Sequence, residues 1–344
     1  MTMNEMQNES ELRICQRCVL PETFPGIVFD NEGVCKHCRR EESAATKASE
    51  KKAEYRERLD QVMESVKGRA PVYDAIVAYS GGKDSSYTLK LLKDRYDLRL
   101  VALTLDNHFV SPAAWENIGK VVDTLEVDHI RLRPSWPVLK RLFRRTARED
   151  IFPVPTLLRA SAICTACIGI VKSLVLKTSL EMSIPLVAFG WSPGQAPIQS
   201  AIMKTNSSLI QKNQEALKNA LPLEIQESME QFFIPENYYG TFEEQFPYNI
   251  HPLAFFDYNE EIIKRQLGDL GWQAPDDTDT NSTNCLLNAF ANQAHIERHG
   301  FHPYVWEVAN MVRQGVMSRE EGKEKIYTEQ NREMVKYAKE RLDL

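Results

Sequence analysis

The chain has little of what ties a protein to a membrane or to nucleic acid. No apolar run approaches the roughly 20 residues that a membrane span needs, and residues 1–11 are polar and acidic, unlike a signal peptide. The formal net charge is −6, whereas proteins whose main partner is nucleic acid usually carry a basic footprint. We therefore expect a cytoplasmic protein with no membrane segment.

One segment departs from this acidic balance. Lys140 to Arg148 is rich in lysine and arginine. Such a cluster is more often the solvated face of a helix than a nucleic-acid site. The expected substrate is therefore a small molecule or a nucleobase, and tRNA is the less favoured partner.

The sequence also lacks the Walker motif G-x-x-x-x-G-K-[ST], which disfavours transfer of a γ-phosphate of the kinase kind. Disulfide bonds are not expected in a cytosolic chain. The seven cysteines are therefore candidates for metal binding or catalysis. Hydrophobic residues make up 43% of the sequence, enough for a buried core.

Four zones follow one another along the chain. Residues 12–40 are rich in cysteine and interrupted by proline and glycine, whereas residues 41–68 are charged, lack proline and predict a linking helix. Residues 70–205 alternate apolar and helical segments, and residues 206–344 predict a mostly helical C-terminal substrate region.

The third zone predicts the fold class. Its apolar runs predict strands at 73–79, 98–105, 128–132 and 184–189. The intervening patterns predict helices at 85–93, 113–125 and 168–181. Strands that alternate with helices indicate an α/β protein with a doubly wound parallel sheet.

Ligands of such sheets bind where the strands end. The loops of interest are therefore Ser80–Ser85, Asp106–Val110 and Gly190–Gln195. A further string beyond the last of these strands, Trp191 to Pro197, is expected to shape the adenine or substrate pocket.

The first of these loops has the composition of a phosphate-binding loop. It reads Ser80, Gly81, Gly82, Lys83, Asp84 and Ser85. Two glycines let backbone N–H groups approach an anion, and the N-terminus of the following helix adds positive potential. Asp84 would be misplaced beside a phosphate unless it holds the loop or meets a metal ion. The alternative is an ordinary strand–turn–helix junction in which Asp84 or Ser85 caps the helix.

This string resembles the signature of the PP-loop ATP pyrophosphatases, the adenine nucleotide alpha-hydrolase-like superfamily. The resemblance covers residues 70–205 and implies an enzyme that binds ATP and Mg²⁺ and cleaves ATP between its α- and β-phosphates. It implies that AMP is placed on a substrate oxygen, usually that of a carbonyl, and is then displaced by nitrogen or sulfur. It also implies a catalytic role for Asp84 and places Asp106 and Gly190 near the nucleotide.

The N-terminal zone carries two CxxC pairs, Cys15 with Cys18 and Cys35 with Cys38. Their spacing is typical of a structural Zn²⁺ ribbon, because two such knuckles present four thiolates to one tetrahedral ion. His37 lies inside the second pair and is not needed as a ligand. Iron in the same cage, or four reduced cysteines without metal, are the alternatives.

The segment from Cys15 to Cys38 is also similar to the N-terminal ribbon of the N-acetyl sugar amidotransferases. These enzymes convert an acyl oxygen on a sugar to an amidine nitrogen, and they share the order of ribbon, helical linker and PP-loop. The similarity covers about the first 90 residues.

Three more cysteines complete the set. Cys164 and Cys167 form a CxxC at the start of a predicted helix, and Cys285 lies far along the chain among polar turn residues. Three thiolates can hold three corners of a 4Fe–4S cluster and leave one iron open. The pattern resembles the cluster-dependent tRNA sulfurtransferases of the PP-loop superfamily. The alternatives are a catalytic dithiol without a cluster and buried structural cysteines.

Two weaker candidates remain. His295 and His299 are four residues apart, on one face of a predicted helix, but no recognised ligand pattern accompanies them. The acidic turn at 276–279 is a candidate Mg²⁺ or substrate site, or simply a solvated loop.

Two enzyme functions follow from these features. The favoured one replaces an adenylated carbonyl oxygen with sulfur, with a 4Fe–4S cluster as carrier and a protein as possible sulfur donor. The other replaces the oxygen with nitrogen from ammonia supplied by a separate glutaminase. A non-enzymatic nucleotide sensor is a third and less favoured reading. A homodimer is possible in each case.

Overall fold

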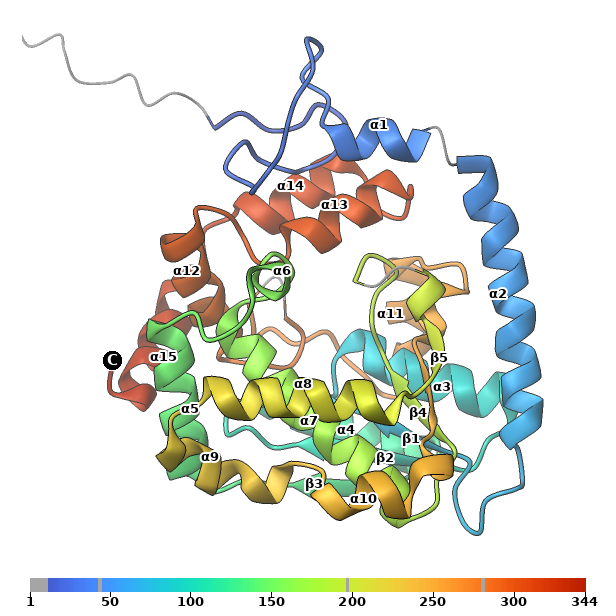
Figure 1. Cartoon of the computed structure of the whole chain (residues 1–344). Helices are drawn as coiled ribbons and strands as arrows, with labels where there is room; N and C mark the ends of the chain where they lie inside the picture. The colour runs from blue at the N-terminus through green and yellow to red at the C-terminus, as the bar shows by residue number, and fades with distance from the viewer. Residues whose placement is uncertain (1–11, 43–44, 196–197, 280–281) are drawn as a thin grey trace, which may run out of the picture.

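A computed structural model describes residues 12–344 except 43–44, 196–197 and 280–281. The polar N-terminal segment 1–11 therefore lies outside the described residues. Within the described chain a single mixed sheet forms the centre, helices cover both of its faces, and the N-terminal ribbon lies against C-terminal helices (Figure 1).

Six strands form the sheet in the order β3-β2-β1-β4-β6-β5. The strands are β1 (Ala75–Ala78), β2 (Leu100–Leu105), β3 (Asp128–Leu132), β4 (Leu186–Phe189), β5 (Ile202–Lys204) and β6 (Tyr248–Ile250). All neighbouring pairs are parallel except β5 with β6. The chain winds outward from β1 in both directions, which confirms the predicted doubly wound α/β class.

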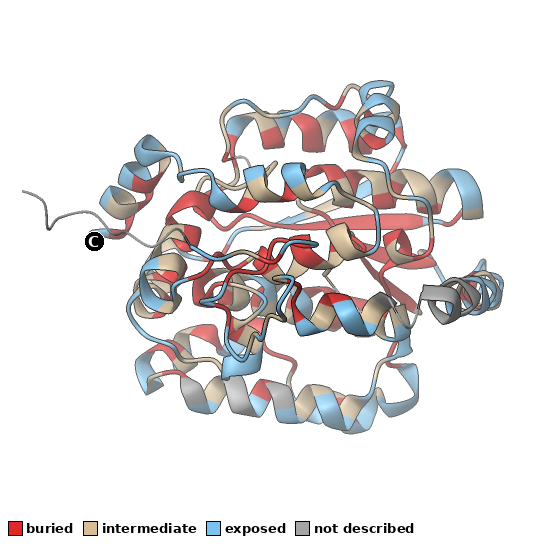
Figure 2. Ribbon diagram, turned by 90° about the horizontal axis from the view of Figure 1, so that it is seen from above, coloured by how far each residue is buried: buried red, intermediate tan, exposed pale blue. Residues whose placement is uncertain are grey.

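The central strands are short and apolar because both of their faces are covered. Side chains alternate along β1: Ile76 joins one hydrophobic core, and Ala75 and Val77 join the other. Buried residues accordingly follow the strands and the inward sides of the helices (Figure 2).

The second core packs helices that include the predicted linker. They are α2 (Ala45–Val66), α3 (Lys83–Tyr96), α4 (Pro112–Thr124) and α11 (Glu260–Gly268). Ser111 caps α4 by accepting from the N–H of Ala114 at 3.1 Å, and Pro112 at its first position suits a helix start.

The first core packs the opposite set. It comprises α5 (Trp136–Arg148), α7 (Ala162–Glu181), α9 (Leu223–Met229), α12 (Asn288–His299) and α15 (Arg332–Leu342). Lys140 to Arg148 forms most of α5, and Lys140 and Arg144 both pair with Asp343 beyond α15. The basic cluster is thus a helix face with intramolecular partners.

Within the described residues, helix α7 is long and apolar enough to cross a membrane by length and composition alone. Its buried residues Ile170, Leu174 and Val175 belong to the first core, and the helix contacts β1, β2 and β4. It is therefore placed as a core helix.

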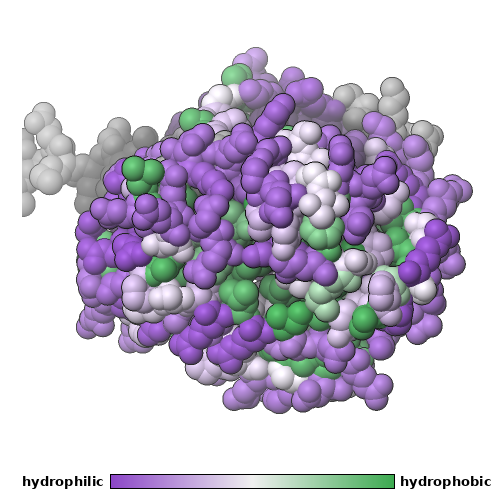
Figure 3. All heavy atoms as spheres, turned by 60° about the horizontal axis from the view of Figure 1, so that its bottom comes forward, coloured by the Kyte–Doolittle hydropathy of each residue, from purple (hydrophilic) through white to green (hydrophobic). Residues whose placement is uncertain are grey.

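The molecular face in Figure 3 is mostly hydrophilic.

The sheet extends past residue 205. Strand β6 lies in the predicted C-terminal region, yet it pairs with β4 and separates it from β5. The described rest of that region is mostly helical, as expected. Its remaining helices are α8 (Ser207–Ala220), α10 (Glu236–Thr241), α13 (Val305–Arg313) and α14 (Arg319–Tyr327). Two short helices, α1 (Lys36–Glu42) and α6 (Val154–Leu157), lie earlier in the chain.

Candidate active site

The Ser80–Ser85 loop connects β1 to α3 at the carboxyl edge of the sheet. Gly81 has a φ of +76°, which favours glycine, and a Cβ there would stand 2.6 Å from Cγ1 of Ile118. The indole of Trp272 donates a 3.0 Å hydrogen bond to the Gly81 carbonyl. The turn is therefore held tightly by α4 and by the chain after α11.

The start of α3 is not an ordinary capped junction. Gly82 is the N-cap and supplies no side-chain cap, so neither Asp84 nor Ser85 plays that part. The hydroxyls of Ser80 and Ser85 lie 3.1 Å apart, and Ser85 donates to the Gly82 carbonyl at 3.0 Å. Hydroxyls and helix-start N–H groups gathered in this way can bind an anion, although the N–H of Lys83 itself donates to the Thr283 hydroxyl at 3.1 Å.

Lys83 and Asp84 form a network with α11 and the residues before it. Nζ of Lys83 lies 3.2 Å from Oδ1 of Asp84 and 3.3 Å from Oε2 of Glu260, and it contacts the Tyr258 hydroxyl. Tyr258 donates to Oδ1 of Asp84 at 2.7 Å. Burial, with the Asp84 charge, raises the pKa of Tyr258, so it remains a donor.

A cavity of about 410 Å³ opens beside this loop, a size typical of small-ligand sites. Its lining combines the loop with residues from far along the chain. Among the lining residues are Lys83, Asp84, Asn107, Cys164, Cys167, Gly190, Trp191, Gln195, Glu260, Cys285, Tyr304, Glu307 and Lys325.

Gly190 lines this cavity, but its clearest role is steric. A Cβ there would lie 2.6 Å from Cα and N of Ser85. The end of β4 and the start of α3 therefore approach too closely for any side chain. In the string that follows Gly190, Trp191 and Gln195 line the cavity, whereas residues 196–197 lie outside the described chain.

Asp106 does not line the cavity. Its buried carboxylate lies 2.6 Å from Arg131 and 3.3 Å from Arg133, and it accepts from the N–H of His108 at 3.0 Å. Burial opposes ionisation, but the hydrogen bond from Arg131 and the other partners lower the pKa. Two arginines engage the Asp106 side chain, while the adjacent Asn107 lines the cavity; the placement of Asp106 near the nucleotide stays a prediction.

The three later cysteines converge in this cavity. The side-chain amide nitrogen of Asn107 lies 3.6 Å from Sγ of Cys167 and 3.7 Å from Sγ of Cys285. Cys285 is placed by an isolated antiparallel bridge to Val110. Cys164 is the third residue of α7, and its N–H donates to the N-cap Ser161 at 3.2 Å.

These thiols are protonated when they bind no metal. Burial raises the pKa of Cys167 to about 12 and that of Cys285 to about 11, and it also raises that of Cys164. The N-terminus of a helix lowers the pKa of a cysteine such as Cys164. Burial outweighs that effect. A metal would displace the protons, because bound sulfur is thiolate.

Sequence reasoning missed two carboxylates in the site. Glu260 begins α11, and Glu307 lies on α13 and accepts from the Ser192 hydroxyl at 2.6 Å. Burial raises the pKa of Glu307 to about 7, with the Ser192 hydrogen bond acting against it and Asp84 acting with it. Neither residue stands in a motif, so only their packing identifies them.

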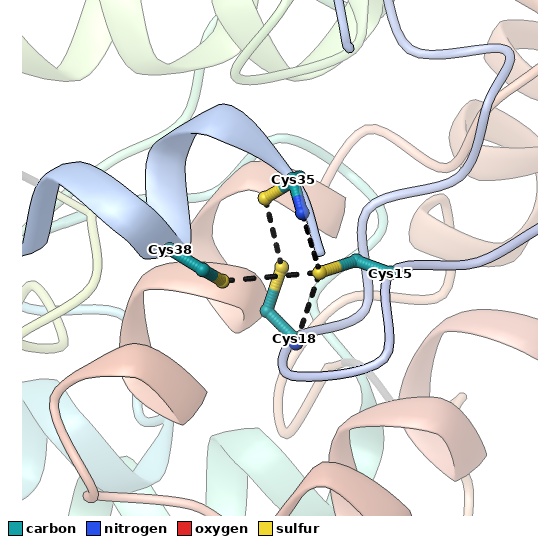
Figure 4. A group of neighbouring side chains, drawn as sticks. All are labelled: Cys15, Cys18, Cys35 and Cys38. Carbon is teal, nitrogen blue, oxygen red and sulfur yellow. Dashed lines mark hydrogen bonds between the residues drawn. The ribbon is translucent and has the colours of Figure 1, made fainter. Parts of the chain in front are cut away.

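The four N-terminal cysteines point their sulfurs toward one another: Cys15 and Cys18 from the coil, Cys35 from the position just before α1, and Cys38 from α1 (Figure 4). Their ligand atoms all lie within 4.8 Å of each other, with Cys15 to Cys38 at 3.9 Å and Cys18 to Cys35 at 3.8 Å. Zn–S bonds of about 2.3 Å separate sulfurs in a tetrahedron by about 3.8 Å. The donor set therefore fits a tetrahedral metal.

His37 packs its ring against Trp306 instead of joining the four sulfurs, with ring centroids 4.9 Å apart. The other histidine pair is also accounted for by packing. His299 lies 3.4 Å from Asp150, but Arg298 donates to the same oxygen at 2.9 Å, which leaves little room for a metal cation.

The acidic turn contributes to structure rather than to the cavity. Asp277 accepts from the N–H of Ala113 at 3.1 Å, at the start of α4. Asp276, Asp277 and Asp279 are absent from the cavity lining.

Fold and site together define a class: an α/β protein with a Gly81–Gly82 turn between its first strand and the next helix, and a cysteine-lined cavity beside that turn. No family model matches the chain. An uncharacterized protein of Methanocaldococcus jannaschii, MJ1599, is 22% identical over 313 residues, covering 91% of this chain and 92% of that protein.

Solved structures give remote likenesses. The U34-tRNA thiolase NcsA from Methanococcus maripaludis with its 4Fe–4S cluster has a TM-score of 0.37 at 13% identity, covering 96% of this chain and 88% of that one. The NH3-dependent NAD synthetase from Campylobacter jejuni has a TM-score of 0.31 at 14% identity, covering 57% and 96%. A predicted tRNA methyltransferase subunit from Methanocaldococcus jannaschii has 0.32 at 17%, covering 67% and 90%. Likenesses this weak say nothing about activity or substrate.

Proposed function

We propose that the chain is an ATP pyrophosphatase-type enzyme that adenylates a carbonyl oxygen and replaces it with sulfur. The observation that carries this proposal is that the Ser80–Ser85 loop and Cys164, Cys167 and Cys285 line one cavity. A substrate carbon adenylated beside the loop would then lie in the same cavity as the sulfur carrier bound by the three cysteines.

The chain's own groups divide the work of the first step. Helix-start N–H groups and Lys83 hold the phosphates, because they place positive charge where negative charge accumulates. Asp84 is fixed by Lys83 and Tyr258 and is free to meet Mg²⁺ through its other oxygen. The carbonyl oxygen attacks the α-phosphorus, and pyrophosphate leaves.

The second step needs a sulfur source. Cys167 and Cys285, whose sulfurs both lie near the Asn107 amide nitrogen, and Cys164, which lines the same cavity, would hold three corners of a 4Fe–4S cluster, which when bound would supply an open iron for sulfide. A dithiol relay is less suited, because burial keeps Cys167 and Cys285 protonated and thiolate is the nucleophile.

The amidotransferase remains a second candidate, and Glu307 favours it. A cavity carboxylate with a pKa of about 7 can accept the proton that attacking ammonia must lose. For both candidates the sequence suggests a small molecule or nucleobase as substrate. The partner would be a sulfur-donor protein for the first candidate and a glutaminase for the second.

The test has two parts. Anaerobic purification followed by iron and sulfide analysis should give equal amounts of both in the wild type. Incubation with ATP, Mg²⁺ and acceptor should release AMP and pyrophosphate, and Asp84→Asn should abolish release while the circular dichroism spectrum stays unchanged. ADP as the main product would rule out the adenylation chemistry; AMP without iron would favour the amidotransferase.

A further inference from the structure

Two lysines that are far apart in the sequence approach the same carboxylate oxygen of Glu260, which lines the cavity. Nζ of Lys83, in the loop, lies 3.3 Å from Oε2 of Glu260. Nζ of Lys325, on α14, lies 3.8 Å from the same oxygen. Both lysines line the cavity, and Lys325 comes from a helix that no sequence motif connects with a nucleotide.

The charges around Glu260 favour anions. Burial would raise the pKa of Glu260, but Lys83, Lys325 and Lys264 outweigh burial and lower it to about 2. Two of these ammonium groups, those of Lys83 and Lys325, line the cavity, whereas Lys264 lies outside it and also pairs with Glu261 at 3.1 Å. Asp84 neutralises part of the remaining charge, and the start of α3 adds positive potential.

Helix α14 is held in place by the N-terminal ribbon. Nη2 of Arg319 donates to the Cys15 carbonyl at 2.9 Å, and the Tyr327 hydroxyl donates to the Val19 carbonyl at 2.7 Å. Lys325 lies between these two anchors, so the position of its backbone depends on the ribbon. Its side chain is 30% exposed, against 9% for Lys83, and can therefore turn toward a ligand.

We propose that Lys325 is a second polyphosphate-binding residue, which contacts the β- or γ-phosphate of ATP, or released pyrophosphate, together with Lys83. Glu260 holds the two ammonium groups in place before the nucleotide arrives. This inference rests on the proposed ATP-dependent function. It assigns to α14, and through it to the ribbon, a direct part in recognising the triphosphate.

The proposal predicts a ligand-specific loss of affinity. Lys325→Met keeps the length of the side chain and removes its charge. Binding of α,β-methylene-ATP and of pyrophosphate, measured by calorimetry on the full chain with Mg²⁺, should weaken by about 10-fold or more, as loss of a charge-assisted hydrogen bond implies. Binding of AMP should be unchanged, and Lys325→Arg should retain most of the affinity.

Lys264→Met is the matched control, because Lys264 lies 3.2 Å from Oε1 of Glu260 but does not line the cavity. The Lys264→Met variant should bind α,β-methylene-ATP, pyrophosphate and AMP with wild-type affinity. An equal loss in Lys264→Met, or an equal loss of AMP binding in Lys325→Met, would overturn the role of Lys325. A wild-type chain that binds neither ATP analogue nor AMP would instead overturn the proposed function itself.

Discussion

Gly190 and Ser85 stand so close that a single methyl group on Gly190 would lie 2.6 Å from the Ser85 backbone. Real Cβ atoms do not approach backbone atoms so closely, so the loop or β4 must shift if one is added. The end of β4 and the phosphate loop are thus positioned as one unit.

Gly190→Ala should therefore weaken the binding of ATP by about 10-fold or more, because the N–H groups at the start of α3 would be displaced from their phosphate-binding positions. Calorimetric titration measures this. Gly119→Ala is the control: Gly119 lies within α4 with nothing within 4 Å of a Cβ, and it should bind ATP normally and gain up to about 1 kcal/mol in stability. Normal binding by Gly190→Ala would contradict the steric argument.

Glu307 predicts a pH-dependent difference in stability. Its pKa is raised from 4.5 to about 7 in the folded chain. The contribution of the neutral Glu307 side chain to the free energy of unfolding is fully present below about pH 4.5. It is lost as the pH rises toward about 7, because this carboxyl ionises in the unfolded chain at a lower pH than in the folded chain. Glu307→Gln avoids burying the charge and should be the more stable protein at pH 8, by up to about 3 kcal/mol.

At about pH 4 the wild type and Glu307→Gln should have nearly the same Tm, because the Glu307 side chain is then mostly neutral in both the folded and the unfolded chain. Thermal unfolding of the two proteins at both pH values provides the measurement. A Tm difference independent of pH would mean that folding does not raise the pKa of Glu307.

Metal at the four N-terminal cysteines should support the fold. Cys35→Ser should lose zinc, measured by elemental analysis, and its Tm should fall by about 5 °C or more, since each kcal/mol shifts Tm by about 2–4 °C. Arg319 connects the ribbon to α14. Compared with the wild type, this variant should therefore lose more affinity for ATP than for AMP. Full stability without zinc would exclude a structural metal.

Cys285→Ser should give the reverse pattern. It should lose iron and sulfide after anaerobic reconstitution but retain zinc, because its sulfur lies with Cys167 around Asn107 and not in the ribbon. Binding of ATP should stay within about 3-fold of wild type. Retention of the iron would mean that Cys285 is not a ligand.

The sequence alone determined the fold class and the local parts of the site. Alternating apolar and helical segments predicted the strands, and β3 was predicted with the boundaries that the structure has. The Ser80–Ser85 string and the cysteine pairs were visible because their chemistry depends on residues adjacent in the chain.

Only the tertiary structure decided which distant side chains complete the site. Lys325 and Glu307 lie on helices without a motif, and they reach the cavity because ribbon and core packing set the rotation of α13 and α14. Asp106 follows its strand as expected but is engaged by arginines of the next strand and the residues after it. Such outcomes depend on contacts between segments far apart in the sequence, which local patterns do not encode.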